Sequence, residues 1–372
     1  MTAPAQTARR GVPVLGPLSM PARVAVLVTV AISLVAIVLD FGLHVEGAAV
    51  FVVSAVAILG LAWIVGLSTE RLGALTGPQV GGILNATFGN IAELIIAFFA
   101  LQAGLITVVK ASLTGSIIGN LLLVLGAAVL AGGLKNGLQT FSQRIAGSNA
   151  ALLVLAAVGL FIPAVFAISG RESEGTRVEE SVLVAIVLII GYGLSLVWQF
   201  TNPEATLGGH GEPEGHAGPV WSGRTAVGVL LVAAALLAVL SEILVGSIEP
   251  FIEQFGLSEL FVGVILIPTI GNLAEHIVAV QLAWKNKIEF AMAVTFGSSL
   301  QVALFVAPLL VFLGLVVGQP MDLVFQPLEI AAVGVAVAIS ALIALDGESN
   351  WLEGALLTLV YLILAVSFFE VQ

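Results

Sequence analysis

Two glutamates, Glu93 and Glu275, lie inside apolar runs that are long enough to enter a lipid bilayer. Each stands in the same short motif, GNIAE at 89–93 and GNLAE at 271–275. A carboxylate at the bilayer centre costs about 2.5–3.5 kcal/mol on insertion scales, so an acid in this position usually has a function. Binding of a cation or a proton is the chemistry that fits, because either one neutralises a buried carboxylate.

The two motifs belong to a longer internal repeat. An offset of 182 residues carries Gly89 onto Gly271, and it also carries the pair at 115–116 onto the pair at 297–298. After a three-residue gap, Glu70 aligns with Glu249. The chain therefore resembles a tandem duplication of one multi-helix unit.

Composition defines the class of protein. Of 372 residues, 59% are hydrophobic and only 9% are charged, which is typical of a polytopic membrane protein. The chain has no cysteine, which excludes disulfides and thiol nucleophiles, so a metal would be bound by oxygen or imidazole. We expect no enzyme and no bound cofactor. The net charge of −11 argues against nucleic acid, and the expected surroundings are a lipid bilayer. A homo-oligomer is compatible with these features.

Hydropathy predicts an all-α protein with eleven transmembrane helices. The apolar runs have the length that a membrane-spanning helix needs. They fall near 22–43, 47–67, 81–103, 108–132, 145–168, 180–200, 224–246, 258–282, 288–316, 324–345 and 351–370.

These helices divide into four parts. We expect an N-terminal tail with an extra helix at 1–46, a first five-helix repeat at 47–200, a linker at 201–223 and a second five-helix repeat at 224–372. An odd number of helices per repeat gives the two repeats opposite orientations in the membrane, a recurring design of secondary transporters. The linker has His and Glu residues that could sense a divalent ion, although a solvated flexible connection explains it more simply.

The distribution of lysine and arginine predicts the orientation. With a cytoplasmic N-terminus, nine of the twelve basic residues fall on the cytoplasmic side and three on the outside. We expect an integral membrane protein of a prokaryotic plasma membrane in this orientation.

The residues around each glutamate suit a hard divalent cation. Asn90 precedes Glu93 by three positions, and Asn272 precedes Glu275 by three, which places each pair on one helical face. Calcium takes about 6–8 oxygen ligands from carboxylates, amides and carbonyls. Calcium and protons would then be mutually exclusive ways to neutralise one site, which is what exchange requires.

A second set of residues has two interpretations. These residues could complete the ligand shell or only aid helix packing, and for His276 the alternatives are a helix–helix hydrogen bond and a proton-handling role. The set consists of Thr87, Thr269, Ser116, Asn120, Ser298, Ser299, Gln301 and His276.

The motif segments resemble a known family. GNIAELIIA and GNLAEHIVA, with LNATFGN before the first and GSSLQVALFVAP after the second, are similar to the two α-repeats of calcium/proton antiporters in the cation/calcium exchanger superfamily. Sodium/calcium exchangers of that superfamily usually have a Gly-Thr/Ser-Ser-x-Pro-Glu motif instead. The resemblance implies an inverted five-plus-five core behind an extra helix, with Glu93 and Glu275 alternately holding calcium and protons.

The sequence therefore predicts a secondary antiporter that exchanges Ca²⁺ for H⁺ by alternating access. The metal ligands would be Glu93 and Glu275, with Asn90 and Asn272 beside them. Calcium is here the transported substrate and not a cofactor. The alternatives are a Na⁺/Ca²⁺ or Mn²⁺/H⁺ exchanger of the same fold.

Overall fold

The computed structural model describes residues 18–76, 84, 87–168, 174–202 and 221–371. Within these residues the regular secondary structure is helical apart from two short strands, β1 (Gln139–Thr140) and β2 (Glu348–Ser349), which pair antiparallel. Most of the predicted linker at 201–223 lies outside the described residues.

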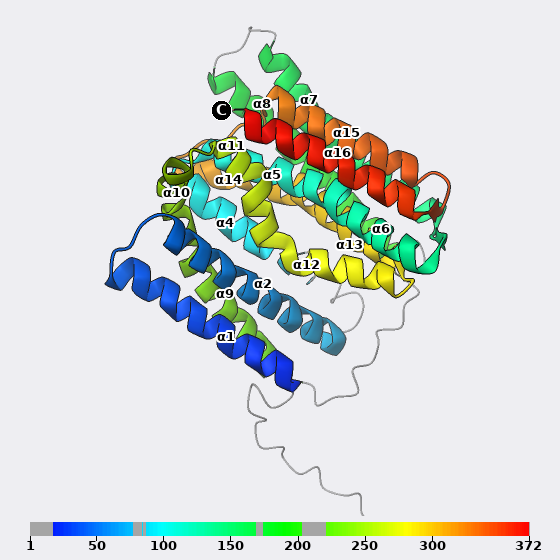
Figure 1. Ribbon diagram of the computed structural model, residues 1–372. Helices are drawn as coiled ribbons and strands as arrows, with labels where there is room; N and C mark the ends of the chain where they lie inside the picture. The colour runs from blue at the N-terminus through cyan, green and yellow to red at the C-terminus, as the bar shows by residue number, and fades with distance from the viewer. Residues whose placement is uncertain (1–17, 77–83, 85–86, 169–173, 203–220, 372) are drawn as a thin grey trace, which may run out of the picture.

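The helices of the first half correspond to the first six apolar runs (Figure 1). They are α1 (Met20–Ile37) with a π-helical turn at Val38–Gly42, α2 (Ala48–Thr76), α4 (Ile91–Gln102), α5 (Ile106–Ile118) continued through a π-helical turn at Gly119–Val124 into α6 (Leu125–Asn136), α7 (Gln143–Ile168) and α8 (Glu174–Thr201).

The helices of the second half correspond to the remaining five runs. They are α9 (Gly223–Gly246) with α10 (Ile248–Phe255), α11 (Glu259–Phe261) continued through a π-helical turn at Val262–Leu266 into α12 (Ile267–Trp284), α13 (Ile288–Gln301) continued through a π-helical turn at Val302–Val306 into α14 (Ala307–Val317), α15 (Pro327–Ile343) and α16 (Trp351–Glu370).

These helices suit a membrane environment. In the described part of the chain, nine helical segments are long and apolar enough to cross a bilayer, and two shorter apolar helices, α4 and α15, complete the set. Many large apolar side chains face outward, for example Val316 and Leu362. In lipid such exposure costs nothing, so the prediction of a polytopic all-α membrane protein agrees with the structure.

Helix packing follows the internal repeat. α2 packs against α9, its counterpart in the other half, and α1 joins this pair along one side of the bundle (Figure 1). The contact of α4 with α9 is matched by that of α12 with α2, and the contact of α6 with α16 by that of α14 with α8. Exchanging the two halves therefore preserves the packing pattern.

The two halves run in opposite directions. Gly115 near the start of the α5–α6 segment packs against Val264, and Asn136 at its end donates hydrogen bonds to the carbonyls of Ala283 and Trp284, so this segment runs parallel to α12. α13 packs against α12 after a three-residue turn and so runs back antiparallel to it. Since α13–α14 is the repeat counterpart of α5–α6, the second half is inverted relative to the first.

Prolines and π-helical turns shape the motif helices. Pro268 stands in the first turn of α12, directly after the π-helical turn at Val262–Leu266. The proline cannot donate a backbone hydrogen bond, and the wider turn absorbs the resulting change in register. Thr269, predicted to lie near freed carbonyls, donates its hydroxyl to Ile265 O at 2.6 Å.

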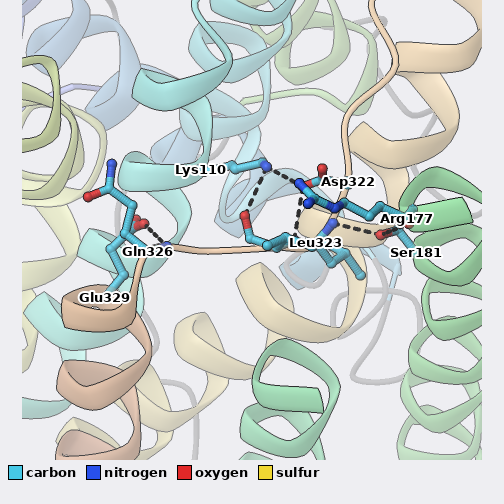
Figure 2. A network of polar contacts seen from close by, with 8 residues as sticks. Lys110, Arg177, Ser181, Asp322, Leu323, Gln326 and Glu329 are labelled. Atoms are coloured by element: carbon cyan, nitrogen blue, oxygen red, sulfur yellow. Dashed lines mark hydrogen bonds and ion pairs between the residues drawn. The ribbon is translucent and has the colours of Figure 1, made fainter. Parts of the chain in front are cut away.

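The connection between α14 and α15 is fixed by polar contacts (Figure 2). The ammonium of Lys110 on α5 forms an ion pair with Asp322 and donates to Val324 O at 2.9 Å. Ser181 on α8 accepts a hydrogen bond from the Leu323 amide at 2.8 Å. These contacts hold one end of the bundle together.

Glu329 caps the start of α15. Its carboxylate accepts a hydrogen bond from the Gln326 amide at 2.8 Å (Figure 2). It also accepts one from the Thr114 hydroxyl at 2.7 Å. Only 2% of this residue is exposed. Both carboxylate oxygens have partners, so Glu329 acts as a buried cap that ties α15 to α5.

Candidate ion-binding site

Glu93 is buried in the first turn of α4 with two side-chain donors. One carboxylate oxygen, Oε1, accepts hydrogen bonds from the Ser116 hydroxyl on α5 and from the Asn272 amide on α12. The other oxygen, Oε2, is buried and has no hydrogen-bond partner among the described residues. Buried acceptors are normally paired, so this oxygen is available to a ligand.

Glu275 on α12 has a matching arrangement. The Ser298 hydroxyl on α13 lies within hydrogen-bonding reach of its carboxylate, as Ser116 does for Glu93, and the two serines occupy the same position in the repeat. Its Oε2 atom is likewise buried and lacks a partner within the described part of the chain. The two carboxylates are close enough for their charges to interact.

A chain of polar side chains links the first motif and the α5–α6 segment to α13. Asn90 donates to Gln301 Oε1 at 2.7 Å and accepts from the Ser298 hydroxyl at 2.9 Å. Asn120 donates to Ser298 Oγ at 3.0 Å. Because a hydroxyl has a single proton, Ser298 can donate either to Asn90 or to Glu275 at one time.

Asn90 differs from the sequence prediction in its backbone. We expected it on the helical face of Glu93, but it is the N-cap residue of α4, with φ −102° and ψ 24°, and therefore precedes the helix. Its counterpart Asn272 lies inside the continuous helix α12. The Gly89-Asn90 turn interrupts the first motif, whereas the second motif is helical throughout.

A cavity leads to Glu275. It has a volume of about 350 Å³ and is lined by segments of α2, α4, α12 and α13, including Gln301 and Ser298. Exposed Glu70 on α2 also lines it. Glu93 lines a separate, much smaller void of about 10 Å³. In this structure the larger cavity therefore reaches Glu275, and Glu93 borders only the small void.

Three of the predicted residues make no described contact with the two carboxylates. Ser299 is buried and donates to Thr295 O on its own helix at 2.9 Å, so its hydroxyl proton is used within α13. His276 is half-buried, and it is not one of the described residues that line the cavity of Glu275. Thr87 is exposed and helical, two residues before the Gly89-Asn90 turn.

The donor set fits a hard cation. It offers two carboxylates with amide and hydroxyl oxygens, which is the oxygen-rich chemistry that calcium prefers. Within the described residues, no group of three or more His, Cys, Asp or Glu side chains could hold a metal. A softer metal therefore has no better site in this part of the chain.

Sequence reasoning missed two residues that support these helices. Gln139, which is 1% exposed, donates to Ala283 O at 3.0 Å and to Asn286 at 2.9 Å, and so binds the C-terminal end of α12. Glu329 was the second. Its only signal in the sequence was its position three residues after Gln326, which is the spacing of a capping box.

The family model described as sodium/calcium exchanger protein matches residues 46–201 and 225–369. The chain belongs to this family. The two matched segments lie close to the predicted repeats at 47–200 and 224–372.

Several relatives in the exchanger family cover nearly the whole chain. A Ca(2+)/H(+) antiporter of Aphanothece halophytica is 46% identical over 346 residues, which are 88% of this chain and 91% of the relative. The Ca(2+)/H(+) antiporter ChaA of Bacillus subtilis is 42% identical over 330 residues, which are 88% of this chain and 93% of the relative.

Solved exchanger structures have the same fold. The structure of native YfkE aligns with a TM-score of 0.80 at 39% identity, over 94% of this chain and 99% of YfkE. The H+/Ca2+ exchanger CAX aligns with a TM-score of 0.71 at 16% identity, over 94% of this chain and 92% of CAX, which shows a shared fold.

Proposed function

We propose that this protein is a secondary antiporter that exchanges Ca²⁺ for H⁺ across a membrane. The observation that carries the proposal is the pair of glutamates from inverted halves, each with one buried carboxylate oxygen that has no partner among the described residues. Relatives that are 42–46% identical are named Ca²⁺/H⁺ antiporters, which supports the same pair of ions here.

Calcium binding follows from the charges at the site. Two carboxylates buried together repel each other and lose the solvation of water, so they require positive charge nearby. A divalent cation between Glu93 and Glu275 would supply it and would use the two unpaired oxygens as ligands. Asn90, Asn272, Ser116, Ser298, Asn120 and Gln301 hold these carboxylates or each other and complete the polar surroundings.

Protons are the alternative source of positive charge. Protonating both carboxylates removes their charge and their affinity for calcium, so the site holds either the metal or protons. An exchanger needs this exclusivity, because each ion must displace the other. Lowering the pH should therefore weaken calcium binding and lowering calcium should favour proton uptake.

The setting that we propose is a prokaryotic plasma membrane with the N-terminus in the cytoplasm. The support is the excess of lysine and arginine on that side, for example Arg71 and Lys285 near the ends of α2 and α12. In this orientation the cavity at Glu275 opens to the cytoplasm, since its wall is the second half of α2 and the first half of the continuous α13–α14 segment.

Transport in proteoliposomes tests the exchange. Purified protein should take up ⁴⁵Ca²⁺ when the lumen is more acidic than the bath, with no sodium present. A sodium gradient at equal pH on both sides should drive no uptake. Sodium-driven uptake that ignores the pH gradient would instead favour a Na⁺/Ca²⁺ exchanger, and competition by Mn²⁺ would measure selectivity between divalent ions.

Neutral variants of the two acids test the site. Glu93→Gln and Glu275→Gln keep the side-chain shape but remove one charge, which should cost at least about 3 kcal/mol, or more than about 100-fold in calcium affinity. Each variant should be inactive in the uptake assay. Glu253→Gln, at an exposed acid on α10, is the matched control and should transport normally. Full activity in either site variant would contradict the proposed site.

A further inference from the structure

An apolar cavity of about 300 Å³ lies between α7 and α15. It shares no lining residue with the cavity at Glu275. Its walls come from these two helices, from Thr114 on α5 and from Phe325 in the α14–α15 connection. Thr114 is the one lining residue with a polar side chain among the described residues, and its hydroxyl already donates to Glu329. The cavity therefore presents hydrocarbon to an occupant.

The cavity opens on the lipid-facing surface of the bundle. On α7, Val154, Val158 and Phe161 line it and are 47%, 49% and 50% exposed. On α15, Gly334 and Ala338 line it and are also exposed. Because these helices are surrounded by a bilayer, the opening meets lipid chains and not water.

Small side chains create the space. α7 and α15 pack against each other, but Ala157 on α7 and Gly334 and Ala338 on α15 are too small to fill the gap between them. A Cβ at Gly334 would meet no atom within 4 Å. Protein interiors are close-packed, and water gains no hydrogen bonds in an apolar cavity. A hydrocarbon chain is the filler that the surroundings supply.

The cavity has the length and direction of an acyl chain. Its lining on α15 extends from Ile330 to Ala338, which is about 12 Å along the helix axis. The hydrocarbon of one leaflet is about 15 Å deep, half of the bilayer core. One end of the cavity is at Phe325, in the connection outside the membrane helices, and the other end lies toward the middle of α15. A lipid anchored at the surface could therefore place most of one chain in it.

Two cations lie at the end of the cavity that Phe325 marks. Lys110 donates to Val324 O at 2.9 Å, one residue before Phe325, and forms an ion pair with Asp322. Arg177 on α8 lies beside the same connection (Figure 2). Its Nε atom is buried and has no hydrogen-bond partner in the part of the chain that the structure describes. A guanidinium with an unused donor suits a phosphodiester.

The charges around this end are mixed. Asp322 offsets the charge of Lys110, and Glu179 and Glu180 follow Arg177 on α8. A free anion would gain little here, because the negative charges offset the positive ones. A phospholipid gains in addition the packing contacts of one acyl chain along the apolar walls.

We propose that this cavity binds one membrane phospholipid, with an acyl chain between α7 and α15 and the phosphodiester beside Arg177. The site lies apart from the carboxylates, so it goes beyond the proposed exchange and does not depend on it. Thr114, which lines the cavity, precedes Ser116 by two residues, and Ser116 donates to Glu93. The lipid would thus pack against the helix that holds one of the acids.

Photo-cross-linking in liposomes tests the site. The full-length protein would be reconstituted with a phospholipid that carries a diazirine near the end of one acyl chain, and the modified residues would be mapped by mass spectrometry. Cross-links should concentrate on residues 154–158 and 334–338, at least about fivefold above the equally lipid-facing stretch 183–194 of α8. Even labelling of all lipid-facing helices would show bulk lipid only and would overturn the proposal.

A filled cavity should exclude the chain. Gly334→Leu places a side chain in the cavity where a Cβ meets no atom, and it should lower cross-linking at 154–158 at least about fivefold. Gly228→Leu is the matched control, because this exposed glycine on α9 also has open space at its Cβ. Ala338→Leu is a second filling variant, and thermal unfolding of each variant monitors folding. Unchanged cross-linking in folded Gly334→Leu and Ala338→Leu would contradict the site.

Arg177→Gln tests the position of the phosphate. Cross-linking by the phospholipid should fall at least about threefold in this variant. A diacylglycerol with the same diazirine chain has no phosphate and should cross-link to the variant as it does to the natural protein. Arg144→Gln, at an exposed arginine near the opposite end of α7, should leave both lipids unaffected. Equal loss of both lipids in Arg177→Gln, or no loss of either, would overturn the placement of the phosphate.

Discussion

Asn272 donates a hydrogen bond to the carboxylate of Glu93, which lies 179 positions earlier in the chain. Each half thus contributes an acid and an amide to one polar cluster, but the arrangement is not symmetric. Asn90, the counterpart of Asn272, donates to Gln301 in this structure. Under the proposed exchange, the Asn272–Glu93 contact would belong to one of two states that the inverted halves form.

Removing this amide should weaken calcium binding. Asn272→Ala leaves Glu93 Oε1 with Ser116 as its remaining described donor, which should cost about 1–3 kcal/mol, or about 5- to 150-fold in calcium affinity. The pH at which uptake is half-maximal should rise, because losing a donor to the charged carboxylate favours its protonated form. Uptake of ⁴⁵Ca²⁺ as a function of pH and calcium concentration measures both effects. Ser299→Ala, which changes only a contact within α13, should leave both unchanged.

A glycine pair should separate stability from turnover. A Cβ at Gly115 would overlap the Val264 carbonyl, whereas a Cβ at its counterpart Gly297 meets no atom within 4 Å. Gly115→Ala should therefore destabilise this conformation by about 1–3 kcal/mol. Gly297→Ala should unfold at the normal temperature but slow exchange, because in the opposite state Gly297 takes the crowded position. Thermal unfolding in detergent and uptake rates test the pair. Normal exchange by Gly297→Ala would argue against the swapped packing.

The ion pair in the α14–α15 connection should contribute to stability and not to the chemistry. Lys110→Met leaves Asp322 without its cation in a partly buried position and should lower the unfolding temperature, with a cost of about 1–3 kcal/mol. Lys110→Met combined with Asp322→Asn should recover part of this loss, as expected for interacting neighbours. A thermal-shift double-mutant cycle gives the coupling. Additive losses would show that the two side chains act independently.

The role of His276 can be decided with a single variant. The sequence left open a proton-handling role or a packing role, and the histidine is half-buried outside the set of described residues that line the cavity. We expect His276→Phe to keep the dependence of calcium uptake on pH. A shift of that dependence without loss of protein stability would assign His276 to proton transfer.

The sequence was sufficient to predict the helical membrane architecture and to locate the two acids, Glu93 and Glu275. Apolar length alone marks helices in a bilayer, because every backbone group must be bonded within its own segment. The duplicated motif identified Glu93 and Glu275, because a carboxylate inside an apolar run is costly in a bilayer and is usually kept for a function. Their roles in ion exchange remain a prediction of the site.

The asymmetry between the halves could not be predicted from the sequence. Asn90 and Asn272 have the same motif, but one is an N-cap and the other is inside a helix. Two aligned residues can also differ in burial, as Ala62 and Ser241 do. A repeat in sequence does not specify which half is open, and under the proposed exchange the structure would hold one of two states in which the halves exchange roles.

The long separation between Glu93 and its partners has a consequence for biosynthesis. Ser116 is translated 23 residues after Glu93, but Asn272 follows only 179 residues later. At about 5–20 residues per second, the amide arrives roughly 10–35 s after the acid. During that interval the nascent first half has to shelter a lone carboxylate in the bilayer, and only the arrival of the second half gives it the surroundings that it keeps.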